Sequence, residues 1–452
     1  MTDAAADRAE RPAIDWNVND FLDGDSLDRE LRRVFGVCHD CRRCSDLCDS
    51  FPRLFDLIDG PGNGALDDVK SGDFAAVVDA CTLCDMCQPA CPYTPPHVHA
   101  VDFPDLMTRY RAWEKRESRR GIFELELGKT DRNGRLMGFL APVANWAARR
   151  KNRLTRPLME AVAGIHRDAV LPQFHATTFT RRAASAPPAI NDAAPAHGRK
   201  AVLYATCFVE YNNPGIGAAA LSVLARNGVE TTTAYPTCCG MPQLERGDIA
   251  SVCERAVRIA AELGGWIDKG YDVVSLVPSC TLMLKTIWPR YLADDPAVSK
   301  LAAHTSDIVD YIVGIARREG LAEGLAPLKG GVALHHACHA RARNEGRKSA
   351  VMMRMIPDCD VLVIEGCSGH GGSWGVMKDN FPVGMKIGEP VARLVAEGGR
   401  RYLVSECPLA GDHIAQGLER LRENETTEFG AAAAMRSHHP IELLAMSYGI
   451  EE

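Results

Sequence analysis

The arrangement of apolar and polar residues divides the chain into four regions. Residues 1–30 have few apolar positions and predict a weakly ordered, acidic tail. Residues 31–108 predict short helices, and residues 109–198 predict a basic helical linker that ends in a stretch rich in proline and alanine. Residues 199–452 alternate apolar runs with helical segments, which indicates a larger folded region.

The last region shows this alternation most clearly near its start. KAVLYATCF (200–208) predicts a strand, GIGAAALSVLARNG (215–228) predicts a helix that stops at Gly228, and VETTTAYP (229–236) predicts a second strand. Strands that alternate with helices are typical of a parallel sheet. We therefore predict an α/β fold for this region and for the chain overall.

The same region contains an internal repeat of cysteine neighbourhoods. Three pairs match at offsets of 131, 129 and 127 residues: Cys207 with Cys338, Cys238–Cys239 with Cys367, and Cys280 with Cys407. An apolar run ends just before each match, and ligands bind at the carboxyl ends of parallel strands. The repeat therefore predicts a duplicated α/β domain, over 199–326 and 327–452, with cysteines where a cofactor would bind.

Two cysteine quartets lie in the N-terminal helical region. Both have the spacing C-x2-C-x2-C-x3-C, over Cys38, Cys41, Cys44 and Cys48 and over Cys81, Cys84, Cys87 and Cys91. In two-cluster ferredoxins the first three cysteines of a quartet hold one cubane and the fourth reaches the other. The pattern predicts an α-helical dicluster ferredoxin-type domain with two 4Fe–4S clusters, held by Cys38, Cys41, Cys44 and Cys91 and by Cys81, Cys84, Cys87 and Cys48.

Zinc is the alternative metal, because two CxxC pairs also make a tetrahedral zinc site. Consecutive quartets with this spacing are unusual for zinc and favour iron–sulfur clusters. The chain has 17 cysteines but no export signal and no apolar run long enough to span a membrane, which predicts a cytoplasmic protein. Its net charge of -7 argues against nucleic acid as a partner.

The linker region is strongly basic, with fifteen basic and six acidic residues over 109–167. Within it LMGFLAPVANWAA (136–148) is apolar for thirteen residues, which is too short to cross a bilayer. Its apolar residues recur at helical spacing. We consider three roles for this helix: joining two domains, packing on a partner subunit, or resting on the inner face of the cell membrane.

The order of a dicluster domain, a basic linker and two CCG-type cysteine-rich domains resembles a known family. It is similar to the iron–sulfur C subunit of anaerobic glycerol-3-phosphate dehydrogenase and to the iron–sulfur subunits of heterodisulfide reductase. The stretches that carry the resemblance are CFVEYNNPGIG (207–217), CCGMP (238–242), SCTLMLK (279–285), HHACH (335–339), HGGSWG (370–375), KDNFPVGMKIGEP (378–390) and HHPIELLA (438–445). Residues 131–150 also look like the linker of the glycerol-3-phosphate dehydrogenase group.

In that family a complete motif supplies one cysteine, a Cys-Cys pair and a C-x-x-C pair. Carried over to this chain, the resemblance implies as metal ligands Cys207, Cys238, Cys239 and Cys280 in the first half and Cys338, Cys367 and Cys407 in the second. Met283 stands at the remaining position of the first half, and Ser368 and Ala410 stand at those of the second. Buried core cysteines are the alternative interpretation.

The resemblance implies a further iron–sulfur cluster in the first half. A cluster in the second half would need a ligand from Ser368, a nearby histidine or the first half. His335, His339 and His370 lie close to these cysteines in sequence and are candidate ligands or proton donors, although a lone histidine is more often a hydrogen-bonded structural residue.

We therefore expect an iron–sulfur electron-transfer subunit of an oxidoreductase. Electrons would pass from a flavin- or diiron-containing partner through two clusters to the CCG domains and on to quinone or another acceptor. We expect no flavin or NAD in this chain, because Gly215-Ile-Gly217 lies too far beyond its strand for a nucleotide loop. The alternatives are a self-contained disulfide or thiol-conjugate reductase, against which the missing cysteines count, and a partner-binding scaffold with a degenerate second CCG domain.

Overall fold

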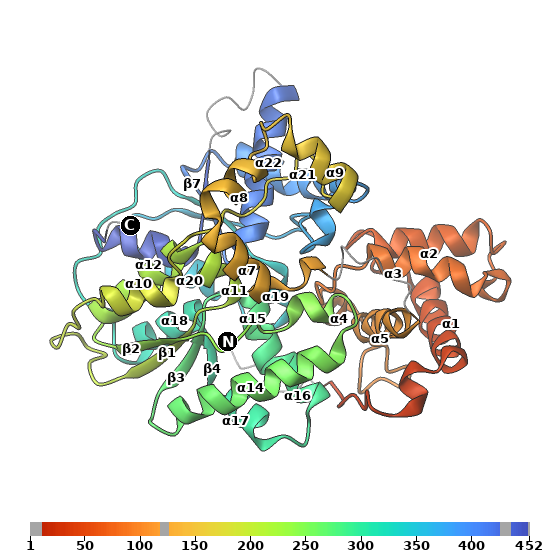
Figure 1. Ribbon diagram of the computed structural model, residues 1–452, viewed down its shortest axis with the longest axis horizontal. Coiled ribbons are helices and arrows are strands. Elements are labelled where there is room, and N and C mark those ends of the chain that lie inside the picture. The colour runs from red at the N-terminus through yellow and green to blue at the C-terminus, as the bar shows by residue number, and fades with distance from the viewer. Residues whose placement is uncertain (1–10, 118–125, 425–434, 451–452) are drawn as a thin grey trace.

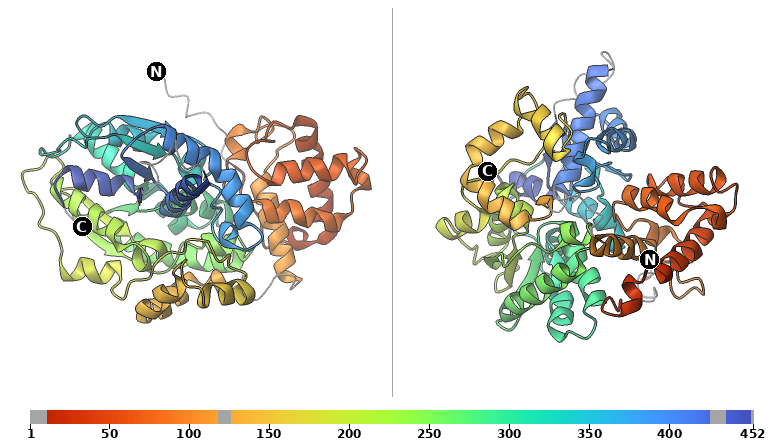
Figure 2. Two further views of the ribbon diagram at one scale, coloured as in Figure 1. Left: turned by 90° about the horizontal axis from the view of Figure 1, so that it is seen from above. Right: turned by 45° about the vertical axis from the view of Figure 1, so that its right-hand side comes forward.

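The computed structural model of the protein describes residues 11–117, 126–424 and 435–450. A helical domain at the N-terminus stands to one side of two α/β units, and helices between these parts run along the α/β units (Figure 1). The helical domain is separate in the two other views as well (Figure 2). This arrangement confirms the predicted fold class, an α-helical N-terminal domain followed by a duplicated α/β domain.

Short helices build the N-terminal domain. They are η1 (Asn19–Leu22), α1 (Gly24–Cys41), α2 (Ser50–Asp59), η2 (Leu66–Asp68), η3 (Ser71–Phe74), α3 (Ala75–Ala80), α4 (Cys87–Ala90) and α5 (Phe103–Arg116), where η marks a 3-10 helix. Buried aromatic rings pack between them: the ring centroids of Phe51 and Phe103 are 4.6 Å apart, and those of Phe35 and Phe74 are 5.2 Å apart. This core supports the loops that carry the cysteines.

In its described part, the linker region contains the helices α7 (Thr130–Phe139), α8 (Ala141–Ala148), α9 (Thr155–Ala163) and α10 (Phe179–Ser185). The single helix expected over 136–148 is therefore two helices that meet at Leu140. Pro142 lies in the first turn of α8 and has no backbone N–H to continue the hydrogen bonds of a preceding turn, so a new helix starts there.

Each α/β unit contains one parallel sheet of four strands. The first has the order β2-β1-β3-β4 and the second β6-β5-β7-β8, and every pairing is parallel. The strands are β1 (Lys200–Tyr204), β2 (Glu230–Ala234), β3 (Asp272–Ser275), β4 (Thr305–Asp307), β5 (Val332–His335), β6 (Val361–Ile364), β7 (Tyr402–Ser405) and β8 (Ser437–His438). The two units thus share a topology as well as a cysteine pattern.

Helices connect these strands and join the two units. In the first unit they are α11 (Cys207–Tyr211), α12 (Pro214–Arg226), α13 (Met241–Leu244), α14 (Ile249–Ile267), α15 (Pro278–Leu282), the π-helical turn η4 (Met283–Ile287), α16 (Trp288–Tyr291), α17 (Pro296–His304) and α18 (Ile308–Arg318). In the second they are α19 (Cys338–Ala342), α20 (Lys348–Met353), η5 (Trp374–Val376), α21 (Phe381–Glu397), α22 (Pro408–Asn424) and α23 (Pro440–Ser447). Three pairs, α12 with α23, α18 with α20 and α15 with α19, pack the units against each other.

The segment expected to be an acidic tail up to residue 30 differs from that expectation in its described part. Helix α1 already begins at Gly24, where the Asp23 side chain accepts a hydrogen bond from the backbone N–H of Ser26 at 2.8 Å. Upstream, the Arg11 guanidinium pairs with Asp85 at 2.7 Å and with Asp102 at 2.6 Å. These carboxylates lie 74 and 91 residues further along the chain, so a local charge count does not reveal them.

A charge network joins this segment to both the helical domain and the first α/β unit. Arg290 pairs with Asp102 at 3.2 Å and also with Asp105, while Arg11 contacts the same two carboxylates from the N-terminal segment. The backbone N–H of Ile14 donates to the Arg290 carbonyl at 2.7 Å. Two guanidinium groups therefore hold the helical domain against the first unit.

Across the three described ranges, no helix combines the length and the apolar character needed to cross a bilayer. This agrees with the hydropathy of the sequence in those ranges.

The charge network makes a prediction about stability. Arg11→Ala leaves Asp85 and Asp102 with less cationic compensation, so we expect the free energy of unfolding to fall by about 3 kcal/mol. Urea unfolding followed by circular dichroism measures the change. Arg33→Ala is the matched control, because its pair with Glu30 is 42% and 36% exposed, and it should cost about 1 kcal/mol or less. Equal stabilities of the two variants would contradict a structural role for the network.

Candidate metal centres

The first cysteine set gathers at the C-terminal end of α1. Cys38 and Cys41 lie in the last turn of that helix, which ends at Arg42 in a left-handed conformation with φ 50°. Burial, followed by the nearby thiols of Cys91, Cys44 and Cys41, raises the pKa of Cys38 well above its ordinary value. The four cysteines therefore share one location, as the sequence predicts for the first cubane.

The second set surrounds a single cavity. Its lining includes all four thiols and an otherwise largely apolar wall: Cys48, Cys81, Cys84, Cys87, Leu47, Phe51, Thr82, Leu83, Asp85, Met86, Phe103 and Pro104. Leu83 and Asp85 have positive φ angles of 50° and 62°, and this left-handed backbone shapes the short loop between the cysteines. Burial, and then Cys84, Asp85, Cys81 and Cys48, raises the pKa of Cys87.

Backbone carbonyls of this loop are held by a buried arginine. Arg111 of α5 donates to the carbonyls of Cys81 and of Val78, the latter at 2.8 Å. Another of its nitrogens donates to the Glu245 carbonyl of the first α/β unit at 3.1 Å. Arg111 thus fixes the second set relative to the first α/β unit.

The donor type and the cavity of the second set fit a 4Fe–4S cluster. Thiolates are the soft ligands that such clusters use, and an apolar wall keeps water from the cluster. Among the described residues, no three His, Cys, Asp or Glu side chains are grouped closely enough to hold a single metal ion. A cubane keeps its thiolates further apart than one ion does, because irons and sulfides lie between them.

The third set lies at the carboxyl ends of β1, β2 and β3 in the first α/β unit. It comprises Cys207, Cys238, Cys239 and Cys280, and the Sγ atoms of Cys207 and Cys238 are 3.7 Å apart. Burial and then all four of these thiols raise the pKa of Tyr204, which ends β1. The structure thus brings together the four cysteines that the sequence proposes for this half.

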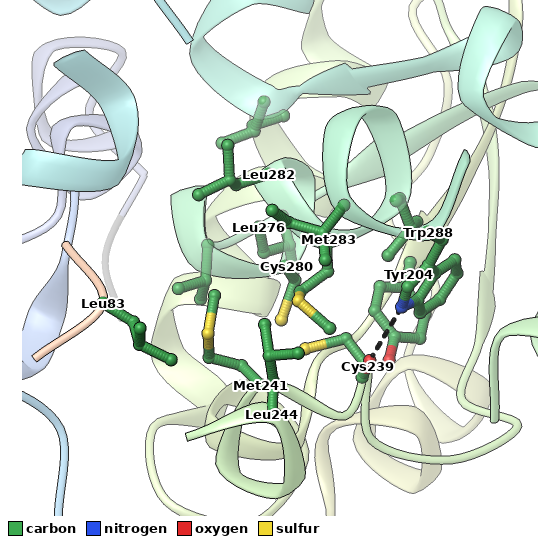
Figure 3. Close-up of a cluster of buried hydrophobic side chains, with 14 of the residues drawn as sticks. Leu83, Tyr204, Cys239, Met241, Leu244, Leu276, Cys280, Leu282, Met283 and Trp288 are labelled. Carbon is green, nitrogen blue, oxygen red and sulfur yellow. Dashed lines mark hydrogen bonds between the residues drawn. The ribbon is translucent and has the colours of Figure 1, made fainter. Parts of the chain in front are cut away.

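The side chains of Cys239, Cys280 and Met283 point toward one another (Figure 3). Met283 is fully buried, and the Trp288 indole N–H donates to the Cys239 carbonyl at 3.2 Å. The position at which the family has a further cysteine therefore carries a thioether, which is a weaker donor than a thiolate.

An aspartate of the linker region supports the third set, and sequence reasoning missed it. Asp131 of α7 accepts hydrogen bonds from the Cys238 backbone N–H at 3.1 Å and from Thr237 Oγ1 at 2.8 Å, and it pairs with Arg255 at 2.6 Å. The sequence feature that could have identified Asp131 is its acidic side chain within an otherwise basic linker region. Through Asp131, the linker positions the Cys238–Cys239 loop.

The fourth set follows β5, β6 and β7 in the second α/β unit. Cys338 begins α19, Cys367 lies in the glycine-rich loop after β6, and Cys407 directly precedes α22. Burial, then Cys407, then Cys367, raises the pKa of Cys338, so these three thiols converge. Ser368 and Ala410, at the two remaining family positions, are both buried.

The second and fourth sets are neighbours, which the sequence did not indicate. Burial and then the thiols of Cys338, Cys48 and Cys367 raise the pKa of Cys84. Cys48 likewise has Cys81 and Cys367 nearby. The second cysteine set of the helical domain therefore lies next to the cysteines of the second α/β unit.

His339 connects three parts of the chain at this junction. One ring nitrogen is 3.1 Å from the Leu83 carbonyl in the cysteine loop, and the other is 2.8 Å from Ser279 Oγ in the first α/β unit. His335, which also lies near Cys338 in sequence, has ring nitrogens 3.0 Å from Ser405 Oγ and 3.3 Å from the Gly366 carbonyl. Both rings are occupied by structural hydrogen bonds.

The remaining sequence features have structural explanations. Cys253 of α14 belongs to the hydrophobic core, and Cys359 is partly buried at its edge. Gly217 of the glycine motif lies inside α12, where a Cβ would meet the Phe179 ring at 2.4 Å. This glycine therefore allows α10 to pack closely on α12.

Comparisons with known proteins agree with this organisation. Residues 31–117 match the Citrate utilization protein B Fer4-like domain, and residues 201–285 match the Cysteine-rich domain called CCG. The chain is 25% identical to the C subunit of anaerobic glycerol-3-phosphate dehydrogenase from Escherichia coli (strain K12) over 352 residues, which cover 77% of this chain and 82% of the relative.

Two further relatives match smaller parts. Lactate utilization protein A of Bacillus pumilus is 26% identical over 216 residues, 45% of this chain and 86% of the relative. The B subunit of fumarate reductase (CoM/CoB) from Methanothermobacter marburgensis is 25% identical over 230 residues, 49% of this chain and 43% of the relative. The chain thus contains a Fer4-like domain and a CCG cysteine-rich domain, and it is homologous to the C subunit of anaerobic glycerol-3-phosphate dehydrogenase and to lactate utilization protein A.

Proposed function

We propose that this chain conducts electrons from a flavin- or diiron-containing partner through two 4Fe–4S clusters to the second α/β unit, and on to quinone or another acceptor. Its parts would be a dicluster domain over 31–108, a linker over 109–198 and two CCG domains over 199–326 and 327–452. The proximity of Cys84 to Cys338 and Cys367 carries this proposal.

The clusters, when bound, supply one-electron redox chemistry. We assign the first to Cys38, Cys41, Cys44 and Cys91, the second to Cys48, Cys81, Cys84 and Cys87, and a further cluster to Cys207, Cys238, Cys239 and Cys280. The mutual effects of the thiols on one another's pKa values support each group. The protein's part is to keep these thiolates close and shielded from water.

The surroundings of the two N-terminal sets support a direction for the electrons. Cys44 and Cys91 of the first set are only half-buried, and Arg42 and Arg43 beside them are exposed. In the second set, Cys84 lies near Cys338 and Cys367 of the second α/β unit. Electrons would therefore enter at the first set and leave through the second, because tunnelling slows steeply with distance.

A partner would supply the two-electron chemistry. Oxidation of an organic substrate by hydride or electron-pair transfer needs a flavin or a nicotinamide, which hands single electrons to iron–sulfur centres only after it has been reduced. Two of the relatives are named as subunits, one of a dehydrogenase and one of a reductase. We propose the same dependence on a redox partner for this chain.

An exposed apolar surface on α7, α8 and α9 supports contact with a membrane that contains quinone. Its members are Leu136, Phe139, Leu140, Val143, Trp146, Leu154, Leu158 and Val162. Phe139 is 87% exposed and Leu154 is 79% exposed, which is unusual for large apolar side chains. Arg149 to Arg153 add four basic residues beside this surface, as expected for a segment that rests on anionic headgroups.

The cluster assignment predicts how iron content responds to substitution. Removing one ligand of the second set by Cys87→Ala should cost the anaerobically purified protein about four irons, because a cubane contains four. Iron analysis and electron paramagnetic resonance measure this, and the signal of the first cluster should persist. Cys253→Ala, a buried cysteine outside every set, is the matched control and should keep all iron. Full iron content in Cys87→Ala would contradict the assignment.

The membrane proposal predicts binding to lipid. The holoprotein should co-sediment with phosphatidylglycerol-containing vesicles, less so at high salt, and Phe139→Asp should weaken binding by roughly tenfold or more, because it replaces an exposed aromatic ring that would insert into the lipid with a negative charge. Val257→Asp on α14 is the control, since Val257 is 46% exposed but lies outside the surface. Equal binding of both variants, or none by the unmodified protein, would rule out this surface.

A further inference from the structure

The second α/β unit lacks two thiols relative to the five-cysteine motif that the family uses. Ser368 replaces one and Ala410 replaces the other, so Cys338, Cys367 and Cys407 remain. Neither a methyl group nor a neutral hydroxyl is a good iron ligand. If electrons pass through this unit, as proposed above, its centre needs donors that the cysteine pattern does not reveal.

One histidine lies one helical turn beyond the first vacant position. His413 and Ala410 are three residues apart in α22 and therefore occupy the same face of the helix. Helical side chains lean toward the N-terminus of their helix, so the His413 side chain covers the region of Ala410. The imidazole thus belongs to the helix face that a cysteine at 410 would share.

The His413 ring is held in the orientation typical of a metal ligand. It makes a hydrogen bond to the backbone of Gly384, while its Nε2 is buried and has no hydrogen-bond partner among the described residues. A hydrogen bond from one ring nitrogen to a backbone carbonyl leaves the lone pair of the other nitrogen available, as it does in metal-binding histidines. An unused buried lone pair is otherwise costly.

A second histidine lies beside the other vacant position. His370 is two residues beyond Ser368, and its Nε2 is also buried without a hydrogen-bond partner in the described parts of the chain. The ring centroids of His370 and His413 are 5.9 Å apart. Burial lowers the pKa of both rings, to about 3 for His370 and about 4 for His413, so both are neutral near pH 7.

The loop that carries His370 is pressed firmly onto α21. A Cβ at Gly369 would meet the Gly384 carbonyl oxygen at 1.9 Å, and one at Gly388 would meet the Ser368 carbonyl oxygen at 2.3 Å. Because glycine has no Cβ, the backbone of the loop around Gly369 can contact the backbone of α21 directly. These glycines fix His370 next to α21, against which α22 and His413 also pack.

We propose that His370 and His413 donate imidazole nitrogens to the iron–sulfur centre of the second α/β unit, together with Cys338, Cys367 and Cys407. Each histidine then replaces one of the two lost cysteines. A neutral imidazole in place of a thiolate reduces the negative charge on a centre and raises its reduction potential, as in clusters of mixed cysteine and histidine ligation. Such a centre would accept electrons readily from the all-cysteine cluster beside it.

The test uses the full-length, anaerobically purified holoprotein labelled with ring-¹⁵N histidine. Pulsed electron paramagnetic resonance should detect strong coupling from ligating ring nitrogens. His413→Ala and His370→Ala should each remove one nitrogen coupling. His413→Cys and His370→Cys should retain iron, lose the corresponding coupling and lower the reduction potential of this centre, which also separates lost ligation from failed folding.

His335→Gln is the matched control, because both ring nitrogens of His335 already have hydrogen-bond partners in the same unit. It should leave the nitrogen couplings unchanged. Holoprotein without strong ring-nitrogen coupling, or with couplings unaffected by either histidine variant, would overturn the inference and would point to Ser368 or to an empty second unit. In those cases the signals of the two N-terminal clusters would persist, whereas failure of the cluster assignment on which the proposed function rests would remove them as well.

Discussion

A thiolate inside a protein needs positive charge beside it, and this requirement governs the structure. Burial and then neighbouring thiols raise the pKa of Cys38, Cys87 and Cys338 in the first, second and fourth sets. In the third set, a hydrogen bond with Cys238 and then burial raise the pKa of Cys207. Without iron, these groups would be neutral, protonated thiols rather than thiolates. The cysteine loops, the aspartate and arginine that support them, and the packing of the helical domain hold together groups that become anionic when they bind iron.

Much of this arrangement could be predicted from local patterns. The spacing of the two quartets predicted two cysteine sets, and the pattern of two-cluster ferredoxins predicted that the fourth cysteine of each quartet joins the other set. The repeat indicated two sheets with cysteines at their carboxyl ends, and both sheets have the same strand order. In each case the residues that matter are close in sequence or follow a strand.

The relations between the parts could not be predicted. The contact between Leu83 and His339 spans 256 residues, and the Arg290–Asp105 pair spans 185, so neither leaves a local pattern. The expected single helix over 136–148 failed for a different reason: its apolar spacing was correct, but Pro142 starts a new helix within it. His413 was missed because only the fold brings it near His370 and α21.

The imidazole of His339 has a consequence for how this chain can change over time. Its two nitrogens contact the cysteine loop of the helical domain and Ser279 of the first α/β unit, while its backbone belongs to the second. A substitution in any of these three places alters a contact needed by the others. The duplicated halves are therefore no longer independent copies, and each can diverge only in ways that the shared ring tolerates.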